Sequence, residues 1–149
     1  MTMDEWDIKL VVLGEPMSQA RPKFQSRDRN GKPLDFVRTR DPSANAKRDF
    51  LAMVQEKAPT KPLLGPLRVD CYFYYAHLSG HYRTGKYAGI LKESAPVWKD
   101  TGKDRDNCDK FVLDALEGVF FRNDSQVCDG RIMKKYSENP RTEVYIKKL

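Results

Sequence analysis

Cysteine and histidine are scarce in this sequence. The three cysteines, Cys71, Cys108 and Cys128, are odd in number, and no two of them have the Cys-x-x-Cys spacing. The sequence therefore predicts neither a disulfide framework nor a zinc ribbon, since both need paired cysteines. The two histidines, His77 and His81, have a separation that metal ligands use, but no cysteine pair completes the set, and a zinc centre is not expected.

Long apolar runs are also missing. No stretch approaches the roughly 20 residues that a membrane-spanning helix needs. The start of the chain carries Asp4, Glu5 and Asp7, whereas a secretory signal begins with basic residues. The sequence thus predicts a protein with no membrane segment that stays in the cytoplasm.

Internal repeats and low-complexity tracts are absent as well, so a chain of 149 residues is expected to form one domain over residues 1–149. Apolar residues make up 40% of the chain, which is enough for a buried core. Charged residues make up 32%, and the net charge of +6 indicates an anionic partner.

The hydrophobic pattern of the first half predicts two strands around a helix. Residues 7–13 indicate a strand that stops at a Gly-Glu-Pro sequence. A helix is expected over 41–57, with Asp41 as its N-cap and Pro42 at its first helical position. Residues 67–75 alternate strictly between apolar and polar positions, which is typical of a half-buried strand.

The second half predicts a helix over 106–117 and strands over 127–135 and 142–147. The expected order is β-α-β-α-β-β. This order corresponds to a single α+β domain whose mixed sheet carries two main helices on one face.

Two polar segments separate these elements. The first polar segment covers residues 16–40. The overlapping stretch from Ala20 to Arg48 holds nine basic residues and three acidic ones. A connector this long and this basic is suited to phosphate binding, although a solvated loop stays open as an alternative.

The second polar segment, residues 77–99, interleaves aromatic and basic residues, a pattern suited to unpaired or distorted nucleic acid. Within it Gly80, Gly85 and Lys86 fit the phosphate-binding pattern G-x-x-x-x-G-K, but Tyr87 stands where that motif needs serine or threonine. Nucleotide hydrolysis is therefore rejected. The residues of the two segments expected to contact nucleic-acid phosphates are Arg21, Lys23, Arg27, Arg29, Lys32, Arg38, Arg40, Arg83, Lys86 and Lys99.

The stretch from Lys103 to Gln126 concentrates the candidate chemistry. On a helix over 106–117, one side is apolar and the opposite side is charged. The apolar side carries Cys108, Phe111, Val112, Ala115 and Leu116, and the charged side carries Asp106, Asp109, Lys110, Asp114 and Glu117.

An extended return after this helix, through the β-prone residues 119–121, would bring Asp124 level with Asp104 and Asp106. Three clustered carboxylates repel one another unless a cation binds among them, and Mg²⁺ prefers such oxygen ligands. Lys110, one turn after Asp106, could then hold a phosphate.

A purely structural interpretation stays open at this point. Asp104 or Asp106 could cap the helix, and Lys110 could pair with Asp106 and Asp114 at i,i+4 spacing. Asp124, with the preceding asparagine, could form a turn.

The combined pattern D-x-D-N-x-x-K, then D-A-L-x-G, then N-D-S-Q resembles the signature of the RusA family of Holliday junction resolvases. A preceding H-x-x-T-G-K-x-A-G-x-L-K-x-S-A-P stretch extends the resemblance, which is to phage- or prophage-like members of that family, to roughly half of the chain. The resemblance implies that Asp104, Asp106, Lys110 and Asp124 are catalytic and that the three aspartates bind the metal. One position departs, because Asn123 stands where the family usually has an acidic residue.

The resemblance further implies a small dimeric fold and a Mg²⁺-dependent endodeoxyribonuclease, with Mn²⁺ as a possible substitute. Such an enzyme resolves four-way DNA junctions by paired symmetric nicks during recombination and repair, in a bacterial or phage-infected cell. Its partners would be branched DNA and a second copy of the chain. Two alternatives are a DNA-binding recombination accessory without catalysis and a less selective nuclease of branched DNA or flaps.

Overall fold

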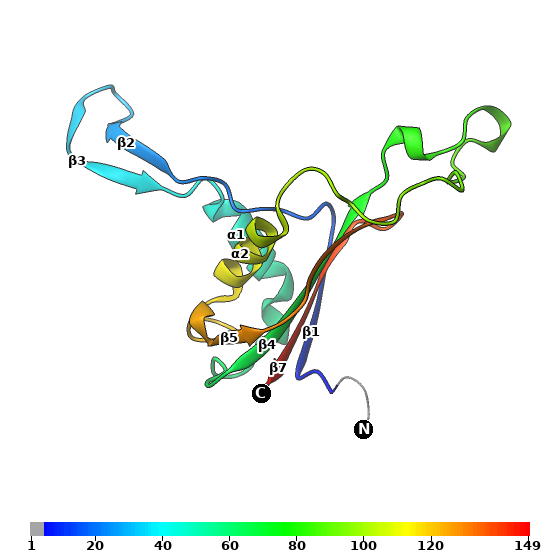
Figure 1. Ribbon diagram of the computed structural model, residues 1–149. Helices are drawn as coiled ribbons and strands as arrows, with labels where there is room; N and C mark the ends of the chain where they lie inside the picture. Colours follow the sequence, from blue (N-terminus) through cyan, green and yellow to red (C-terminus); the bar gives the residue numbers. More distant parts are fainter. Residues whose placement is uncertain (1–4) are drawn as a thin grey trace.

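The computed structural model describes residues 5–149, so Asp4 lies outside the described residues. A five-stranded mixed sheet carries two helices on one face, and a separate two-stranded ribbon projects from the body (Figure 1). Short 3-10 turns occur at Gln55–Lys57, Ser79–His81, Gly85–Tyr87 and Asp124–Gln126. The main elements are β1 (Ile8–Leu13), β2 (Lys23–Arg27), β3 (Pro33–Arg40), α1 (Ala44–Val54), β4 (Leu67–Ala76), α2 (Arg105–Leu116), β5 (Val127–Asp129), β6 (Ile132–Ser137) and β7 (Arg141–Lys148).

The sheet has the strand order β1-β7-β4-β5, and β6 also pairs with β4. The β1–β7 and β7–β4 pairs are antiparallel, whereas β5 and β6 run parallel to β4. Leu10, Val144 and Cys71 form one fully buried row across three strands. The predicted mixed α+β sheet and the alternation of β4 are therefore confirmed.

Both helices pack on the same face of the sheet, and α2 follows its prediction to within one residue at each end. The predicted apolar stripe is buried, and Phe111 at its centre meets Phe50 of α1 edge-on with ring centroids 5.9 Å apart. The start of α1 was predicted wrongly. Ser43, not Asp41, is its N-cap, because the Asp41 carboxylate accepts the Ser43 backbone N–H at 2.8 Å in a turn that precedes the helix.

The first polar segment is not an irregular loop, contrary to the prediction. Strands β2 and β3 pair antiparallel, with Lys23 opposite Arg40 and Gln25 opposite Arg38. We call residues 23–40 the ribbon. Its turn is closed by the Asp28 carboxylate, which accepts backbone N–H groups of residues 30 and 32.

The strand predicted over 127–135 is divided into β5 and β6 at Gly130. This glycine has a φ of 154°, and a Cβ atom there would lie 1.8 Å from the carbonyl oxygen of Val69. No other residue fits so close an approach of two backbones.

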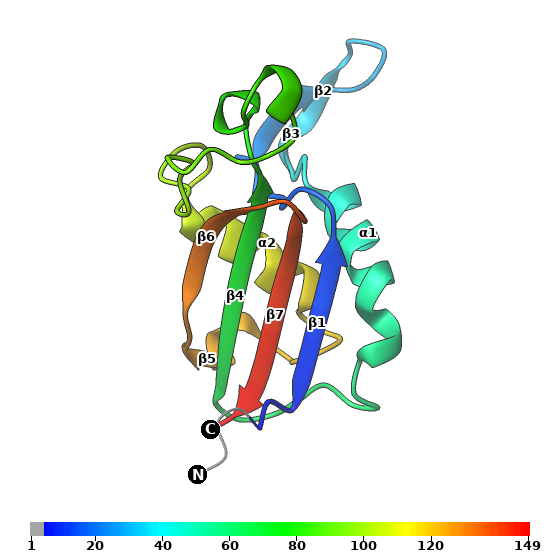
Figure 2. The same cartoon turned by 90° about the vertical axis from the view of Figure 1, so that its right-hand side faces the viewer.

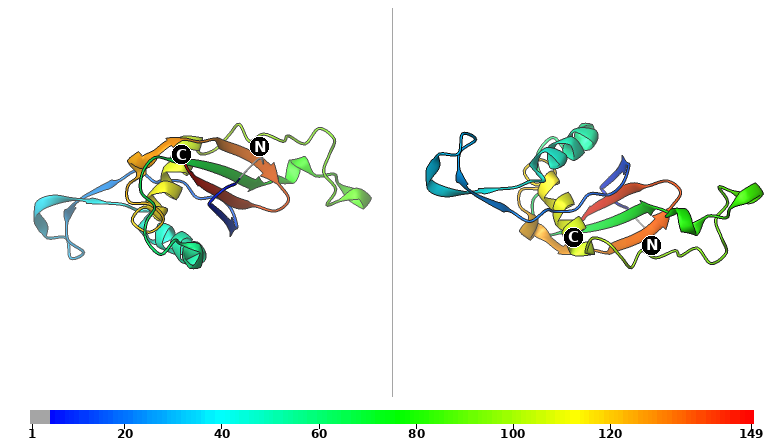
Figure 3. Two further views of the ribbon diagram at one scale, coloured as in Figure 1. Left: turned by 90° about the horizontal axis from the view of Figure 1, so that it is seen from below. Right: turned by 90° about the horizontal axis from the view of Figure 1, so that it is seen from above.

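The second polar segment, residues 77–99, forms a long excursion that we call the loop arm. The ribbon and the loop arm project in opposite directions from the same end of the sheet (Figures 1 and 3). No helix among residues 5–149 is long and apolar enough to cross a membrane.

Candidate active site

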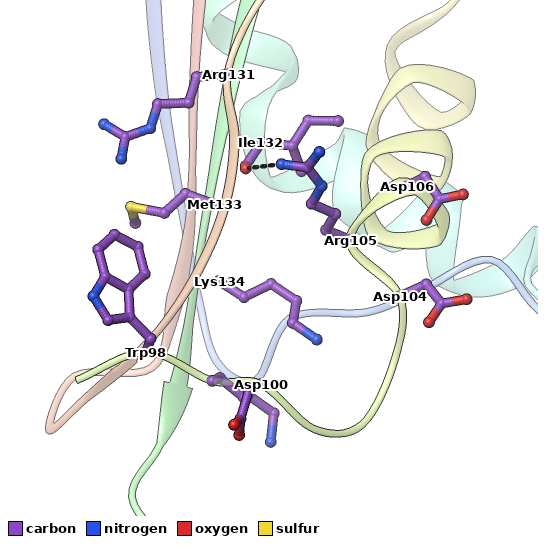
Figure 4. Close-up of a pocket in the computed structure, with 10 residues that line it drawn as sticks. Trp98, Asp100, Asp104, Arg105, Asp106, Arg131, Ile132, Met133 and Lys134 are labelled. Atoms are coloured by element: carbon purple, nitrogen blue, oxygen red, sulfur yellow. Dashed lines mark hydrogen bonds between the residues drawn. The ribbon is translucent and has the colours of Figure 1, made fainter. Parts of the chain in front are cut away.

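The first turn of α2 presents two free carboxylates. Asp104 occupies the N-cap position with extended backbone, and Asp106 lies in the first turn. Both side chains are exposed, and within residues 5–149 neither carboxylate accepts a hydrogen bond or forms an ion pair. In Figure 4 they point to the same side, while Arg105 between them points to β6 and donates to the Ile132 carbonyl at 3.3 Å. Asp104 therefore does not serve as a side-chain cap, and both carboxylates are available to a ligand.

Lys134 of β6 holds the segment that leads into α2. Its ammonium donates to the carbonyl oxygens of Thr101 at 3.1 Å and Lys103 at 2.6 Å. A hollow of about 570 Å³ lies beside this segment, and Lys134, Asp104 and Asp106 are among its lining residues. The backbone before the acidic pair is thus fixed by a side chain from the sheet edge.

Lys99 and Trp98 line the same hollow. The Lys99 ammonium lies 5.0 Å from the ring centroids of both Tyr75 and Tyr136, and Lys135 lies 4.5 Å from the ring of Trp98. Lys99 was predicted to contact phosphate. In this structure its ammonium group packs against the two rings, and Lys99 lines the same hollow as Asp104 and Asp106.

Asp124 lies at the opposite end of α2, so the prediction that an extended return brings it level with Asp104 and Asp106 is wrong within one chain. Residues 118–121 form a tight turn in which Phe120 and Phe121 are buried. The Asp124 backbone N–H then donates to the Glu117 carboxylate at 3.0 Å, beside the C-terminal end of the helix. Twelve helical residues separate the two ends, which corresponds to about 18 Å.

Asn123 and Gln126 hold this second acidic position. The Asn123 side chain accepts the Ser125 backbone N–H at 2.9 Å, and the Gln126 side chain accepts the Asn123 backbone N–H at 2.8 Å. The Gln126 amide also donates to the carbonyl oxygens of Leu63 and Gly65. The Asp124 carboxylate itself has no partner among residues 5–149.

The charged side of α2 is only partly as predicted. Asp114 pairs with Lys47 of α1 at 3.1 Å, and Lys47 also pairs with Asp41 at 2.7 Å. The Lys47 ammonium holds the pKa of the Asp41 carboxyl below its usual value. Lys110 is exposed one turn after Asp106, and within residues 5–149 it forms no ion pair with Asp106 or Asp114.

Asp109 of α2 was predicted to face solvent, but its side chain is half-buried between the helix and the sheet. Burial raises the pKa of its carboxyl, although a hydrogen bond from the Cys71 thiol opposes that shift. A helix wheel that divides α2 into two halves places this residue at the boundary, and the sheet beneath then covers it.

The base of the ribbon is attached next to the acidic pair. The Gln19 backbone N–H donates to the Asn107 carbonyl at 3.0 Å, and the Ala20 N–H donates to the Ser43 hydroxyl at 2.9 Å. These bonds anchor the ribbon between the two helices. All seven ribbon-side residues predicted to contact phosphate are exposed: Arg21, Lys23, Arg27, Arg29, Lys32, Arg38 and Arg40.

Arg83 and Lys86 are exposed on the loop arm, where both lie over the ring of Tyr87. Lys134 and Arg131 were missed by the sequence reasoning, although both line the hollow beside the acidic pair. For Lys134 the sequence could have shown this only with the strand register known. Once β6 is aligned with β4, the alternation of side chains places Lys134 on the same side of the sheet as α2.

The acidic pair can supply part of a metal site. Among residues 5–149 no three His, Cys, Asp or Glu side chains come together in one chain. Mg²⁺ is usually held by one or two carboxylates together with water and substrate phosphate, so Asp104 and Asp106 suit that ion by chemistry.

Comparison with known proteins gives two findings. A family model described as Endodeoxyribonuclease RusA matches residues 14–147. A Bacillus subtilis (strain 168) protein named "Uncharacterized protein YqaN" is 34% identical over 144 residues, which cover 95% of this chain and 96% of the relative.

Proposed function

Since this chain belongs to the RusA family of endodeoxyribonucleases, we propose that it resolves four-way DNA junctions by paired, Mg²⁺-dependent nicks. The observation that carries the proposal is the pair of exposed, unengaged carboxylates at Asp104 and Asp106, at the start of α2. This helix lies between the two cationic projections in Figure 1. A nuclease that cuts at a branch point has to hold more than one DNA arm. The ribbon and the loop arm, which project in opposite directions (Figure 3), would supply two phosphate-binding surfaces for this purpose.

Asp104 and Asp106 would hold the metal ion. When bound, Mg²⁺ supplies an activated water and stabilises charge on the scissile phosphate. The protein groups do the positioning: Lys134 fixes the segment before Asp104, and the ribbon orients the DNA. Lys110, exposed on the next turn of α2, is placed to offset charge on a phosphate that lies against Asp106.

Asp124 joins this site only from a second subunit. A Mg²⁺ ion binds oxygen at about 2.1 Å, so its ligands lie within about 4 Å of one another, far less than the length of α2. In a two-fold dimer with the α2 helices side by side and antiparallel, the C-terminal end of one helix would lie against the N-terminal end of the other. The partner subunit's Asp124 would then complete each acidic pair, and a dimer would carry two sites for two symmetric nicks.

The test is cleavage of a labelled four-way junction with and without Mg²⁺. We expect cleavage only with the metal, and Asp106→Asn should lower the rate by about a hundredfold or more while junction binding stays equal or becomes tighter, because a negative charge beside phosphate is removed. Glu56→Gln, which removes an exposed carboxylate beyond α1, is the matched control and should cut normally.

Near wild-type cutting by Asp106→Asn would exclude the acidic pair as the metal site. Equal cutting of flaps and junctions would instead assign the chain to less selective branched-DNA cleavage. Junction binding without any cutting would indicate a recombination accessory.

A further inference from the structure

No helix among residues 5–149 covers the sheet face opposite α1 and α2, and Figure 2 looks directly onto it. Strict alternation places one set of side chains of β1, β7, β4 and β6 on this side, which we call the outer face. The outer-face residues that matter here are Trp6, Lys9, Tyr72, Tyr74, Tyr145 and Lys147.

The outer face carries a cluster of partly exposed rings rather than the small polar residues usual on a solvated sheet. The Tyr145 ring lies 5.6 Å from that of Trp6 and 5.5 Å from that of Tyr72. The Arg141 guanidinium lies over the Tyr74 ring at 3.9 Å. Trp6, Tyr72 and Tyr145 line a shallow hollow of about 320 Å³, and Lys9 lies at the same hollow.

The charge of the outer face is positive where it is not already paired. Two of its acidic residues form ion pairs: Asp70 with Arg68 at 3.1 Å and Glu143 with Arg141 at 3.5 Å. Asp7, at the edge, accepts the backbone N–H of residue 148. Within residues 5–149 no ion pair neutralises Lys9, which lines the hollow, or Lys147, which stands opposite Arg68 in the β4–β7 register.

We propose that the outer face is a second DNA-binding surface, which takes an unpaired strand. Rings beside unpaired cations suit bases that stack and phosphates that pair with ammonium groups. A second copy of this chain is a poorer occupant, because an isologous contact would present this same face, on which the carboxylates of Asp70 and Glu143 are already ion-paired, and burial of Lys9 and Lys147 without a new partner is costly. Double-stranded DNA would use the cations but leave the rings without a partner, since its bases are already stacked.

The outer face is continuous with the candidate active site. The two surfaces meet at the strand β6. The hollow beside Asp104 and Asp106 is also lined by Trp98, Met133 and Arg131 (Figure 4). Met133 is paired with Tyr72 in the β4–β6 register, so both lie on the outer face. A strand separated at a junction could therefore pass over β6 onto the rings. This inference rests on the proposed action on DNA.

The test is binding of short labelled oligothymidine by the full-length protein without divalent metal, followed by fluorescence anisotropy over a salt series. Lys9→Ala with Lys147→Ala should weaken binding at low salt and reduce the slope of log affinity against log salt by about 1.4, the value for two contacts with a single strand. Lys57→Ala with Lys61→Ala is the control, because it removes two exposed charges from the segment after α1.

The contribution of the rings is read from position 145. Tyr145→Ala should weaken oligothymidine binding at least about fivefold, whereas Tyr145→Phe keeps the ring and should bind as wild type does. The proposal is overturned if wild type does not bind the oligonucleotide, or if the Lys9 and Lys147 variant binds as tightly as wild type or no more weakly than the control. Junction cleavage by wild type, measured separately, shows whether the proposed function fails instead.

Discussion

A mixture of two inactive variants should recover activity if each active site is shared between subunits. In Asp106→Asn the acidic pair is broken, and in Asp124→Asn the other acidic position is lost. In a mixed dimer with shared sites, one site combines both substitutions and the other combines none. Co-expression of the two variants should therefore restore nicking that neither variant shows alone.

The expected size of the effect follows from the geometry of α2. Because its 12 residues hold Asp106 and Asp124 about 18 Å apart, a site that combines both residues would take them from different chains. Random pairing gives about half mixed dimers, each with one intact site, so about a quarter of all sites should be active. The product should be singly nicked junction, since no dimer in the mixture has two intact sites.

The assay separates dimers by two affinity tags, and a denaturing gel then follows the two strands of the labelled junction. A mixed dimer of Asp106→Asn with the double variant Asp106→Asn, Asp124→Asn is the control, since it has no intact site in any arrangement. Absence of nicking in the first mixed dimer, with dimer formation demonstrated, would refute the shared site. Nicking by the Asp124→Asn homodimer would instead show that Asp104 and Asp106 act without Asp124.

Three further predictions concern binding and stability. Lys23→Ala with Arg40→Ala removes two basic residues that face each other across the ribbon. It should lower the slope of log affinity against log salt for junction binding by about 1.8, for every DNA sequence tested. An unchanged slope would show that these two residues do not contact phosphate. Lys47→Met should lower the free energy of unfolding by about 1–2 kcal/mol at pH 7, because Asp41 and Asp114 lose their shared cation. The folded-state pKa of Asp41 lies below its unfolded value, so this deficit should shrink in urea titrations as the pH falls below about 4, and a constant deficit would contradict the ion-pair explanation. Asp109→Asn should raise the melting temperature relative to wild type as the pH rises above about 4. Burial raises the pKa of the Asp109 carboxyl, so the wild type loses stability when this group ionises and the variant does not. Equal melting temperatures at all pH values would contradict a destabilising effect of the ionised carboxylate.

The central elements were predictable because each carries a strong local pattern. The alternation of β4 and the apolar stripe of α2 fix which side chains are buried, whatever the rest of the chain does. The C-terminal end of α2 was predictable because Gly118 adopts the left-handed conformation that commonly ends a helix.

The ribbon was not predictable from periodicity because it has no core to face. Its polar and basic side chains dominate both strands. Of its apolar ones, Phe24, Phe36 and Val37 are exposed and Leu34 is partly buried. Such a ribbon is held by its backbone pairing and by its anchored base, and neither leaves an apolar alternation in the sequence.

Asp124 shows how a chain-length argument can fail. Residues 118–124 are long enough to run back along α2, and their β-prone side chains favour an extended path. Phe120 and Phe121 instead turn into the core, where full burial of each ring contributes roughly 2–3 kcal/mol. This gain outweighs local β propensity, which spans only about 1 kcal/mol, and it leaves Asp124 at the far end of the helix.

The departure at Asn123 bears on the turn rather than on the metal. Its side-chain oxygen accepts the Ser125 N–H and closes the turn that presents Asp124, and an aspartate oxygen could accept the same bond. Gln126 completes the arrangement by bonding back to residue 123 and across to the segment before β4. Two of the four residues in the N-D-S-Q motif therefore hold the backbone, and only Asp124 offers an unengaged carboxylate. An asparagine at position 123 preserves the support of that carboxylate and adds no negative charge beside it.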